Sequence, residues 1–250
     1  MRTYLPILLL GCFACGGDDG GNTGGADAST DSSGTIDASV DGPIAPAMIT
    51  LSGTATSRTV QGAQPVADAV IAAYRNADEA TPVAMTTTTA SGAFTLMVPT
   101  GGVALDGFLK ATKAGFVATY LYAPAPIAAD TAMLPIIMLT TGTYGTVYVL
   151  AGVGEQANKG TIAVVVTDAA NMPVAGATVS STPAATYKYN GANGLPSGSA
   201  TATAADGVAY MMNAPLGPVT VTAAKAGSTF AAHAVKAFDG ALTTTLIVPQ

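Results

Sequence analysis

Apolar and polar residues alternate with period two in several short segments of the chain, and these segments predict β-strands. Clear examples cover residues 93–98, 162–166 and 242–248, where threonine or another small residue fills most of the intervening positions. In the last of these, we expect Leu242 and Leu246 to share the buried face. Half-buried strands show this pattern because successive side chains point to opposite faces of a sheet. Turn residues separate such segments every 8–12 positions or so, which is typical of an antiparallel β-sandwich.

Four short landmarks occur twice in the same order, which indicates an internal duplication. They are P-V-A-[DG]-A at residues 65–69 and 173–177, a Ser-Gly or Asp-Gly turn at 91–92 and 206–207, P-x-G-x-V at 99–103 and 215–219, and K-A-G at 113–115 and 225–227. The copies are separated by 108, 115, 116 and 112 positions, respectively. Because these offsets differ little, we expect two tandem modules that differ only by small loop insertions.

This order of landmarks resembles the carboxypeptidase regulatory-like domain. The resemblance covers about residues 48–140 and 160–249. It implies a small transthyretin-like or Ig-like β-sandwich for each copy, used as an accessory module without catalytic residues. The first copy departs from the family pattern at Ser91, where Asp is usual, and the second carries an insertion at 187–199 that is rich in Gly and Asn.

The segment between the copies is predicted to be a short helix, with a continuing strand as the alternative. Thr143 is a candidate helix cap, and Gly152 would end the helix. The apolar face would then contain Tyr144, Val147, Tyr148 and Ala151. The strand alternative follows from the β-prone sequence Val-Tyr-Val at 147–149.

These observations together predict an all-β chain with two tandem antiparallel β-sandwiches of about seven strands each and a short helix between them. The predicted boundaries are a leader at residues 1–15, a Gly/Asp/Ser tether at 16–46, a first module at 47–141, a connector at 142–159 and a second module at 160–250.

Composition and charge limit the classes of partner that such a chain can bind. Charged residues make up 10% of the sequence, against roughly 25% in an average soluble domain. The net charge is −6, and most of it belongs to residues 1–46, which hold six Asp and a single Arg. The absence of a Lys/Arg stripe argues against a nucleic-acid partner. No cofactor is expected.

The leader resembles a bacterial lipoprotein signal. Arg2 precedes an apolar run at residues 5–14, which is too short to span a bilayer and has the length of a signal-peptide core. In lipoproteins the peptidase cuts just before a cysteine that receives the lipid. We favour Cys15, and Cys12 is the alternative because Leu9-Leu10-Gly11 precedes it. A plain secretory signal is a further alternative.

The resemblance to lipoproteins implies a membrane partner and a place in the bacterial cell envelope. No acidic residue directly follows either cysteine, which favours the outer membrane, facing the periplasm or the cell surface. The tether has too little apolar surface to offset the chain entropy of folding, and we expect it to be disordered with a reach of roughly 30 Å. Its Asp residues lack the Glu and the spacing of a calcium loop.

Candidate chemistry in the two modules is sparse. His233 is the single histidine, and no nucleophile and acid converge on it in the predicted strands. Asp78-Glu79 is the one acidic pair of the body and lies in a predicted turn. We therefore expect no catalytic residue and no metal site, and we predict a non-enzymatic surface or periplasmic scaffold or binding module with an unknown protein or glycan partner.

A glycan-binding module is the alternative function. Tyr187 and Tyr189 lie two positions apart, hence on one strand face, beside the polar insertion. Sugar sites often present such aromatic platforms. Tyr120 and Tyr122 have the same spacing, and core or cross-strand packing is the preferred interpretation of that pair.

Overall fold

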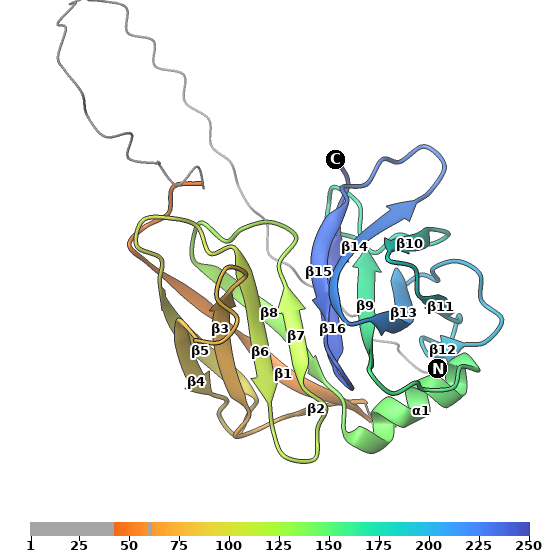
Figure 1. The fold of residues 1–250 in the computed structure, drawn as a ribbon, viewed down its shortest axis with the longest axis horizontal. Coiled ribbons are helices and arrows are strands. Elements are labelled where there is room, and N and C mark those ends of the chain that lie inside the picture. Colours follow the sequence, from red (N-terminus) through yellow and green to blue (C-terminus); the bar gives the residue numbers. More distant parts are fainter. Residues whose placement is uncertain (1–42, 60–61) are drawn as a thin grey trace, which may run out of the picture.

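The computed structural model describes residues 43–59 and 62–250, and in this part of the chain the all-β prediction is confirmed. Two β-rich modules lie side by side with a single helix beneath their junction (Figure 1). The strands of the first module are β1 (Met48–Thr59), β2 (Gly62–Pro65), β3 (Val70–Arg75), β4 (Ala84–Thr87), β5 (Ala93–Pro99), β6 (Gly107–Thr112), β7 (Thr119–Tyr122) and β8 (Thr131–Met138).

The second module follows the helix α1 (Thr141–Ala151). Its strands are β9 (Lys159–Val166), β10 (Thr178–Thr182), β11 (Thr186–Asn190), β12 (Pro196–Ser197), β13 (Val208–Pro215), β14 (Gly217–Ala224), β15 (His233–Ala237) and β16 (Leu242–Ile247).

Each module packs one sheet on another around a core of alternating residues. In the first module, β1 pairs with β2, β5 and β8, and the order β4-β3-β6-β7 forms the opposing layer. The buried positions of β5 are Phe94, Leu96 and Val98, as the alternation predicts. In the second module, Ile162, Val164 and Val166 of β9 are fully buried in the same way.

The strand pairings are the same in the cores of the two modules. Strand β1 runs antiparallel to β5 and parallel to β8, and β9 has the same two relations with β13 and β16. The order β3-β6-β7 in the first module matches β10-β14-β15 in the second. The copies differ at the fourth strand, because β4 pairs with β3 whereas β11 pairs with β13.

A buried threonine fixes the same turn in both modules. Thr88 Oγ1 donates to the carbonyl of Val66 at 2.6 Å and accepts from the amide of Ala69 at 2.9 Å. Thr203 makes the same two bonds at the same distances in the second module. Thr203 follows Thr88 by 115 positions, which is also the offset of the adjacent Ser-Gly and Asp-Gly turns.

The modules share a continuous sheet, which the sequence did not predict. Strands β7 and β16 pair in parallel, with Leu242 opposite Thr119 and Thr244 opposite Leu121. The result is one nine-stranded sheet in the order β12-β11-β13-β9-β16-β7-β6-β3-β4. The prediction of two separate, purely antiparallel sandwiches is therefore refined: three pairings are parallel, and one of them joins the modules.

The predicted helix between the modules is confirmed, and its cap differs from the prediction. Thr140 is the N-cap, and its side chain accepts a hydrogen bond from the amide of Thr143, the residue expected to cap. Gly152 ends the helix in the left-handed conformation, with φ 65°. Of the four residues expected on the buried face, Tyr144, Tyr148 and Ala151 are buried, and Val147 is partly buried.

Two further expectations need correction. In β16 the face toward the module core contains Thr243, Thr245 and Ile247, not Leu242 and Leu246. Leu242 instead packs with α1, because this strand lies inside the nine-stranded sheet and is covered on both faces. Residues 43–46, expected in the tether, pair with the loop at 102–104 of the first module.

Candidate functional site

The most distinctive feature of the molecule is the junction between its modules, and its centre is aromatic. On β6 and β7, Leu109 and Ala111 face the core of the first module, whereas Phe108, Tyr120 and Tyr122 point to the opposite face of the sheet. Those three side chains are buried all the same, with 4%, 8% and 4% of their surface exposed. They belong to the hydrophobic cluster of the second module, which covers them.

The ring of Phe238, from the loop between β15 and β16, provides much of that cover. It stacks on Tyr120 with centroids 3.7 Å apart and planes inclined by 8°, and it contacts Phe108 at 6.0 Å. Phe108 also stacks on its cross-strand partner Tyr122, at 5.0 Å, and on Tyr74, at 5.4 Å. Aromatic pairs add about 0.5–1.5 kcal/mol each beyond the area that they bury.

Hydrogen bonds complete the joint. The amide of Leu242 donates to the carbonyl of Ala118 at 3.0 Å, and Thr245 Oγ1 donates to the carbonyl of Tyr122 at 3.0 Å. Burial also raises the pKa of Tyr122 above its ordinary value, because the ionised phenolate would lose its hydration there, and the nearby carboxylate of Glu79 adds to the effect. The joint is therefore a packed, hydrogen-bonded interior and not a flexible linker.

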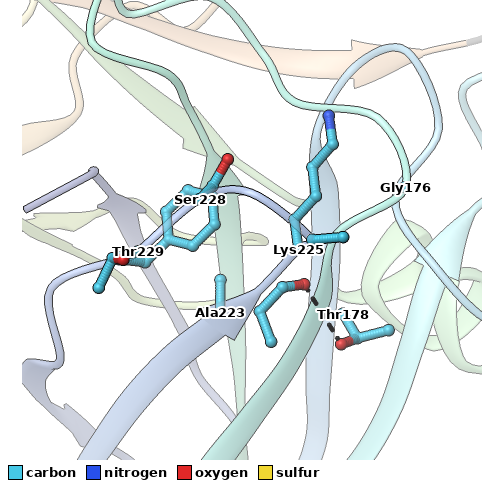
Figure 2. A pocket seen from close by; sticks show the side chains of 9 residues that line it. Gly176, Thr178, Ala223, Lys225, Ser228 and Thr229 are labelled. Carbon is cyan, nitrogen blue, oxygen red and sulfur yellow. Dashed lines mark hydrogen bonds between the residues drawn. The ribbon is translucent and has the colours of Figure 1, made fainter.

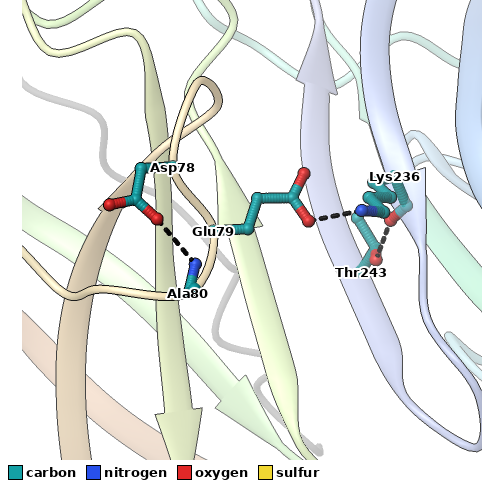
Figure 3. A network of polar contacts seen from close by, with 5 residues as sticks. All are labelled: Asp78, Glu79, Ala80, Lys236 and Thr243. Carbon is teal, nitrogen blue, oxygen red and sulfur yellow. Dashed lines mark hydrogen bonds and ion pairs between the residues drawn. The ribbon is translucent and has the colours of Figure 1, made fainter.

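An ion pair closes the rim of the junction (Figure 3). Lys236 of β15 reaches across to the carboxylate of Glu79 in the first module, and both side chains are about one third exposed. The neighbouring Asp78 is held in its turn by the amides of Ala80 and Thr81, at 3.0 and 3.2 Å. Those backbone hydrogen bonds lower the pKa of Asp78. The acidic pair of the sequence therefore has structural partners, one within the turn and one across the modules.

Helix α1 braces the junction from the other face of the shared sheet. The hydroxyls of Tyr144 and Tyr148 both bond Thr161 Oγ1, each at 2.8 Å. Apolar residues from both modules pack around the helix, among them Val117 from the first and Met212 from the second. The connector is thus part of the packed body, and the shared sheet is covered where the modules meet.

Two shallow pockets lie on the surface, one on each module, and the one on the first module borders the junction at Ala118. The first, of about 480 Å³, is bounded by Gly176, Thr178 and the loop at 225–230 (Figure 2). Figure 2 shows Lys225 extending beside the loop that carries Gly176, and Ser228 and Thr229 on the opposite side. The second pocket, of about 550 Å³, is lined by Asp68, Val70, 112–114, Phe116 and Ala118.

The structure gives the tyrosines of the insertion structural partners. Tyr189 is 5% exposed, and its hydroxyl accepts a hydrogen bond from the amide of Val179 at 3.1 Å. Tyr187 is partly buried, and its hydroxyl accepts from the amide of Ser181 at 3.0 Å. Both tyrosines therefore supply acceptors to amides of β10. Glycan binding by this pair stays a sequence-based prediction, and neither ring forms an open platform.

The remaining sequence-based sites are placed as follows. Cys12, Cys15 and the tether up to residue 42 lie outside the described residues. His233 begins β15, where its Nε2 is buried without a hydrogen-bond partner among the described residues. Within residues 43–59 and 62–250, no group of three or more His, Cys, Asp or Glu side chains is arranged to hold a metal ion. The same residues include no helix of the length and apolarity needed to cross a bilayer.

Sequence reasoning missed Phe238 and Lys236, two of the residues of the second module that contact the first. Neither belongs to a repeated landmark. The available signal was the aromatic pair Tyr120 and Tyr122, which lacks any aromatic counterpart in the second copy.

Comparison with known proteins leaves the family of the chain open. No family model matches it, and no curated protein matches it. Solved structures with some likeness include the Bacillus anthracis TIE protein (13% identity, 81% of this chain and 34% of that one, TM-score 0.26), shaft pilin SpaA from Lactobacillus rhamnosus GG (15%, 81% and 98%, 0.26) and the minor pilin GBS52 from Streptococcus agalactiae (11%, 80% and 95%, 0.27).

The chain spans about a third of the TIE protein that it matches. TM-scores this low support no inference about this chain, so its function rests on its own residues.

Proposed function

We propose that the chain is an exported, lipid-anchored scaffold of the bacterial cell envelope that acts without catalysis. The nine-stranded sheet, which continues across the module boundary, carries this proposal. Backbone pairing between β7 and β16 fixes the angle between the modules, because a hinge motion would break those hydrogen bonds and expose the aromatic centre. A body of this kind suits a scaffold whose two modules stay at a fixed distance from each other.

The leader and the tether supply the other half of the proposal. A lipid on Cys15 would attach the chain to a membrane, and the segment that follows would give the rigid body a reach of roughly 30 Å. Two or three acyl chains on one cysteine give stable attachment, at about 0.8 kcal/mol per buried CH₂, whereas one chain gives only marginal attachment.

Replacing the cysteines one at a time tests the anchor. We expect Cys15→Ser to move the protein from the membrane fraction to the soluble fraction of the producing bacterium, and Cys12→Ser to leave it in the membrane. Mass spectrometry of the N-terminal peptide should show the lipid mass on Cys15. A soluble wild-type protein, or a lipid on Cys12, would contradict this assignment.

Cross-linking in intact cells tests the scaffold role. Full-length chain carrying a photoreactive residue at the exposed Thr220 should give reproducible cross-links to envelope components, and Cys15→Ser should abolish them. Unchanged cross-links in the Cys15→Ser variant would show that anchoring is irrelevant to partner contact. No cross-links at all, together with normal envelope integrity after gene deletion, would contradict a scaffold.

A further inference from the structure

The two surface pockets occupy the same place in the two copies of the fold. Every residue that lines the pocket of the first module has a counterpart in the second, 108 positions later for Asp68 and Val70 and 112 positions later for the remainder. The counterparts are Gly176, Thr178, Ala224, Lys225, Ala226, Ser228 and Phe230. The turn beneath each pocket is also the same, because Phe116 and Ser228 donate to the carbonyls of Lys113 and Lys225, both at 3.1 Å.

In the first module the lysine of this pocket, Lys113, makes a hydrogen bond within the protein. Lys113 Nζ donates to the carbonyl of Ala67 at 2.5 Å, and Asp68 lines the same pocket with a compensating negative charge. Val70 and Phe116 make the adjacent surface apolar. One N–H of the Lys113 ammonium is thus engaged by the backbone, and an anionic ligand in this pocket would meet the carboxylate of Asp68.

In the second module the charge balance of this pocket differs. Gly176 replaces Asp68, so the compensating charge is gone, and Lys225 Nζ has no hydrogen bond or ion pair with any described residue. Thr178 replaces Val70 and Ser228 replaces Phe116, which adds two hydroxyl groups to the lining, and the hydroxyl of Thr178 donates to the carbonyl of Ala224 at 3.4 Å. At the two other changed positions, Ala224 replaces Thr112 and Phe230 replaces Ala118. The duplicated pocket has therefore become a positively charged pocket with several hydroxyl groups.

We propose that the pocket at Lys225 binds the carboxylate of an acidic saccharide. The ammonium group carries one charge, which matches a carboxylate better than a dianionic phosphate. The hydroxyls of Ser228 and Thr229 can bond either the carboxylate or neighbouring sugar hydroxyls. Ala223 and Phe230 provide an apolar floor, and a volume of about 480 Å³ accepts a single sugar ring while the open mouth leaves room for a longer chain.

The duplication supplies matched variants for a test. In Gly176→Asp the second pocket receives the acid of the first. This variant should fold, because the equivalent Asp68 already adopts φ 51° and a Cβ at Gly176 would meet no atom within 4 Å. Lys225→Ala removes the ammonium group, and Lys113→Ala is the control for loss of a lysine from the other pocket.

Amide NMR titration of the full chain in detergent, with a galacturonic acid trisaccharide as the probe, measures the binding. We expect millimolar affinity, with shifts confined to 176–178 and 225–230. Affinity should fall about tenfold or more in Lys225→Ala and Gly176→Asp, the scale of a charge-assisted hydrogen bond, and should not change in Lys113→Ala. The methyl ester of the probe should bind the wild-type chain as weakly as the free acid binds Lys225→Ala and Gly176→Asp.

Four outcomes would overturn the proposal. They are no shifts at tens of millimolar probe, equal binding of the methyl ester, wild-type affinity in Lys225→Ala or Gly176→Asp, and tighter binding of inorganic phosphate than of the saccharide. Loss of scaffold function would leave this result unaffected, because the pocket lies away from the junction.

Discussion

The same sheet face has opposite character in the two modules. In the first module it presents Tyr74, Phe108, Tyr120 and Tyr122, and the second module covers them. At the equivalent positions of the second module stand Thr182, Thr220, Ala232 and Ala234, all of them exposed. Each of these residues follows its counterpart by 108 positions for the residue on β3 and by 112 positions for those on β6 and β7. Paired strands of the two modules show the same two offsets. The pairings of these strands are therefore the same in the two modules, and the residues of this face decide which module is covered.

Because of this difference, the equivalent face of the second module cannot form a junction of the same aromatic kind. The second module offers threonine and alanine where a third module would need an aromatic surface. Among the described residues β8 pairs only with β1, and Pro135 in β8 cannot donate a hydrogen bond to a further strand. Pairing of β7 with β16 also covers one strand edge of each module, because either module alone would expose that edge to solvent.

The largest expected effect comes from removing the aromatic centre of the junction. Phe108→Ala should lower the free energy of unfolding by about 3–5 kcal/mol, because it deletes a buried ring and leaves a cavity between the modules. The matched change Thr220→Ala, at the equivalent exposed position, should stay within about 0.5 kcal/mol. Urea unfolding of both variants measures this contrast. Similar losses of unfolding free energy in the two variants would mean that the two faces contribute equally to stability.

Substitution of two glycines tests whether the turns at Gly92 and Gly207 are equivalent in the two modules. Gly92 and Gly207 have φ of 75° and 66°, and a Cβ would meet a backbone carbonyl oxygen at 2.4 Å in the first module and 2.6 Å in the second. Gly92→Ala and Gly207→Ala should each cost about 2–3 kcal/mol in urea unfolding, from strain at positive φ and displacement of the adjacent strand. A large loss in one variant and none in the other would show that the turns are not equivalent.

His233 introduces a pH dependence that the first module lacks, because Leu121 occupies the equivalent position. Burial lowers the pKa of His233, and the carboxylate of Asp106 opposes this shift. The folded protein therefore favours the neutral imidazole. Its contribution to stability is complete above the unfolded-state pKa of about 6.5 and is lost as the pH falls through the lower folded-state pKa.

His233→Leu should remove this pH dependence. The free energy of unfolding of the variant, relative to the wild type, should rise as the pH is lowered from 8 to 5. Thermal unfolding at intervals across that range gives the curve. A constant difference between the two proteins would show that His233 titrates alike in the folded and unfolded states.

The smallest effect belongs to the ion pair at the rim. Lys236→Met should lower the free energy of unfolding by no more than about 1 kcal/mol, because a pair that is one third exposed is screened by solvent. The loss should shrink further in about 1 M salt. A salt-independent loss would instead point to the contact of the Lys236 side chain with the ring of Phe238.

Much of the fold could be predicted from the sequence because duplication and alternation are local signals. The alternation in 93–98 and 162–166 marked the buried faces of β5 and β9 correctly. It failed in β16, where both faces are buried and a threonine face lines the core. No periodic signal distinguishes a strand at the edge of one module from a strand that pairs with the next.

The candidate sites could be predicted less well from the sequence, because they depend on contacts between segments that only the fold brings together. Tyr187 and Tyr189 share a strand face as predicted, but the amides of β10 that engage their hydroxyls are brought near only by the packing of the two sheets. Lys113 and Lys225 belong to a recognised landmark. The structure was needed to show that Lys113 bonds the carbonyl of Ala67 beside Asp68, whereas Lys225 lies beside Gly176 without a bonded partner among the described residues.

A distance measurement between the modules tests the central claim, that the shared sheet makes them one rigid body. Spin labels at the exposed Thr87 and Thr220, in the full chain with both leader cysteines replaced by serine, report that distance by pulsed electron paramagnetic resonance. We predict a single narrow distance distribution that Phe108→Ala broadens. A broad distribution in the otherwise unaltered body would contradict the claim, because it would show two modules that move independently.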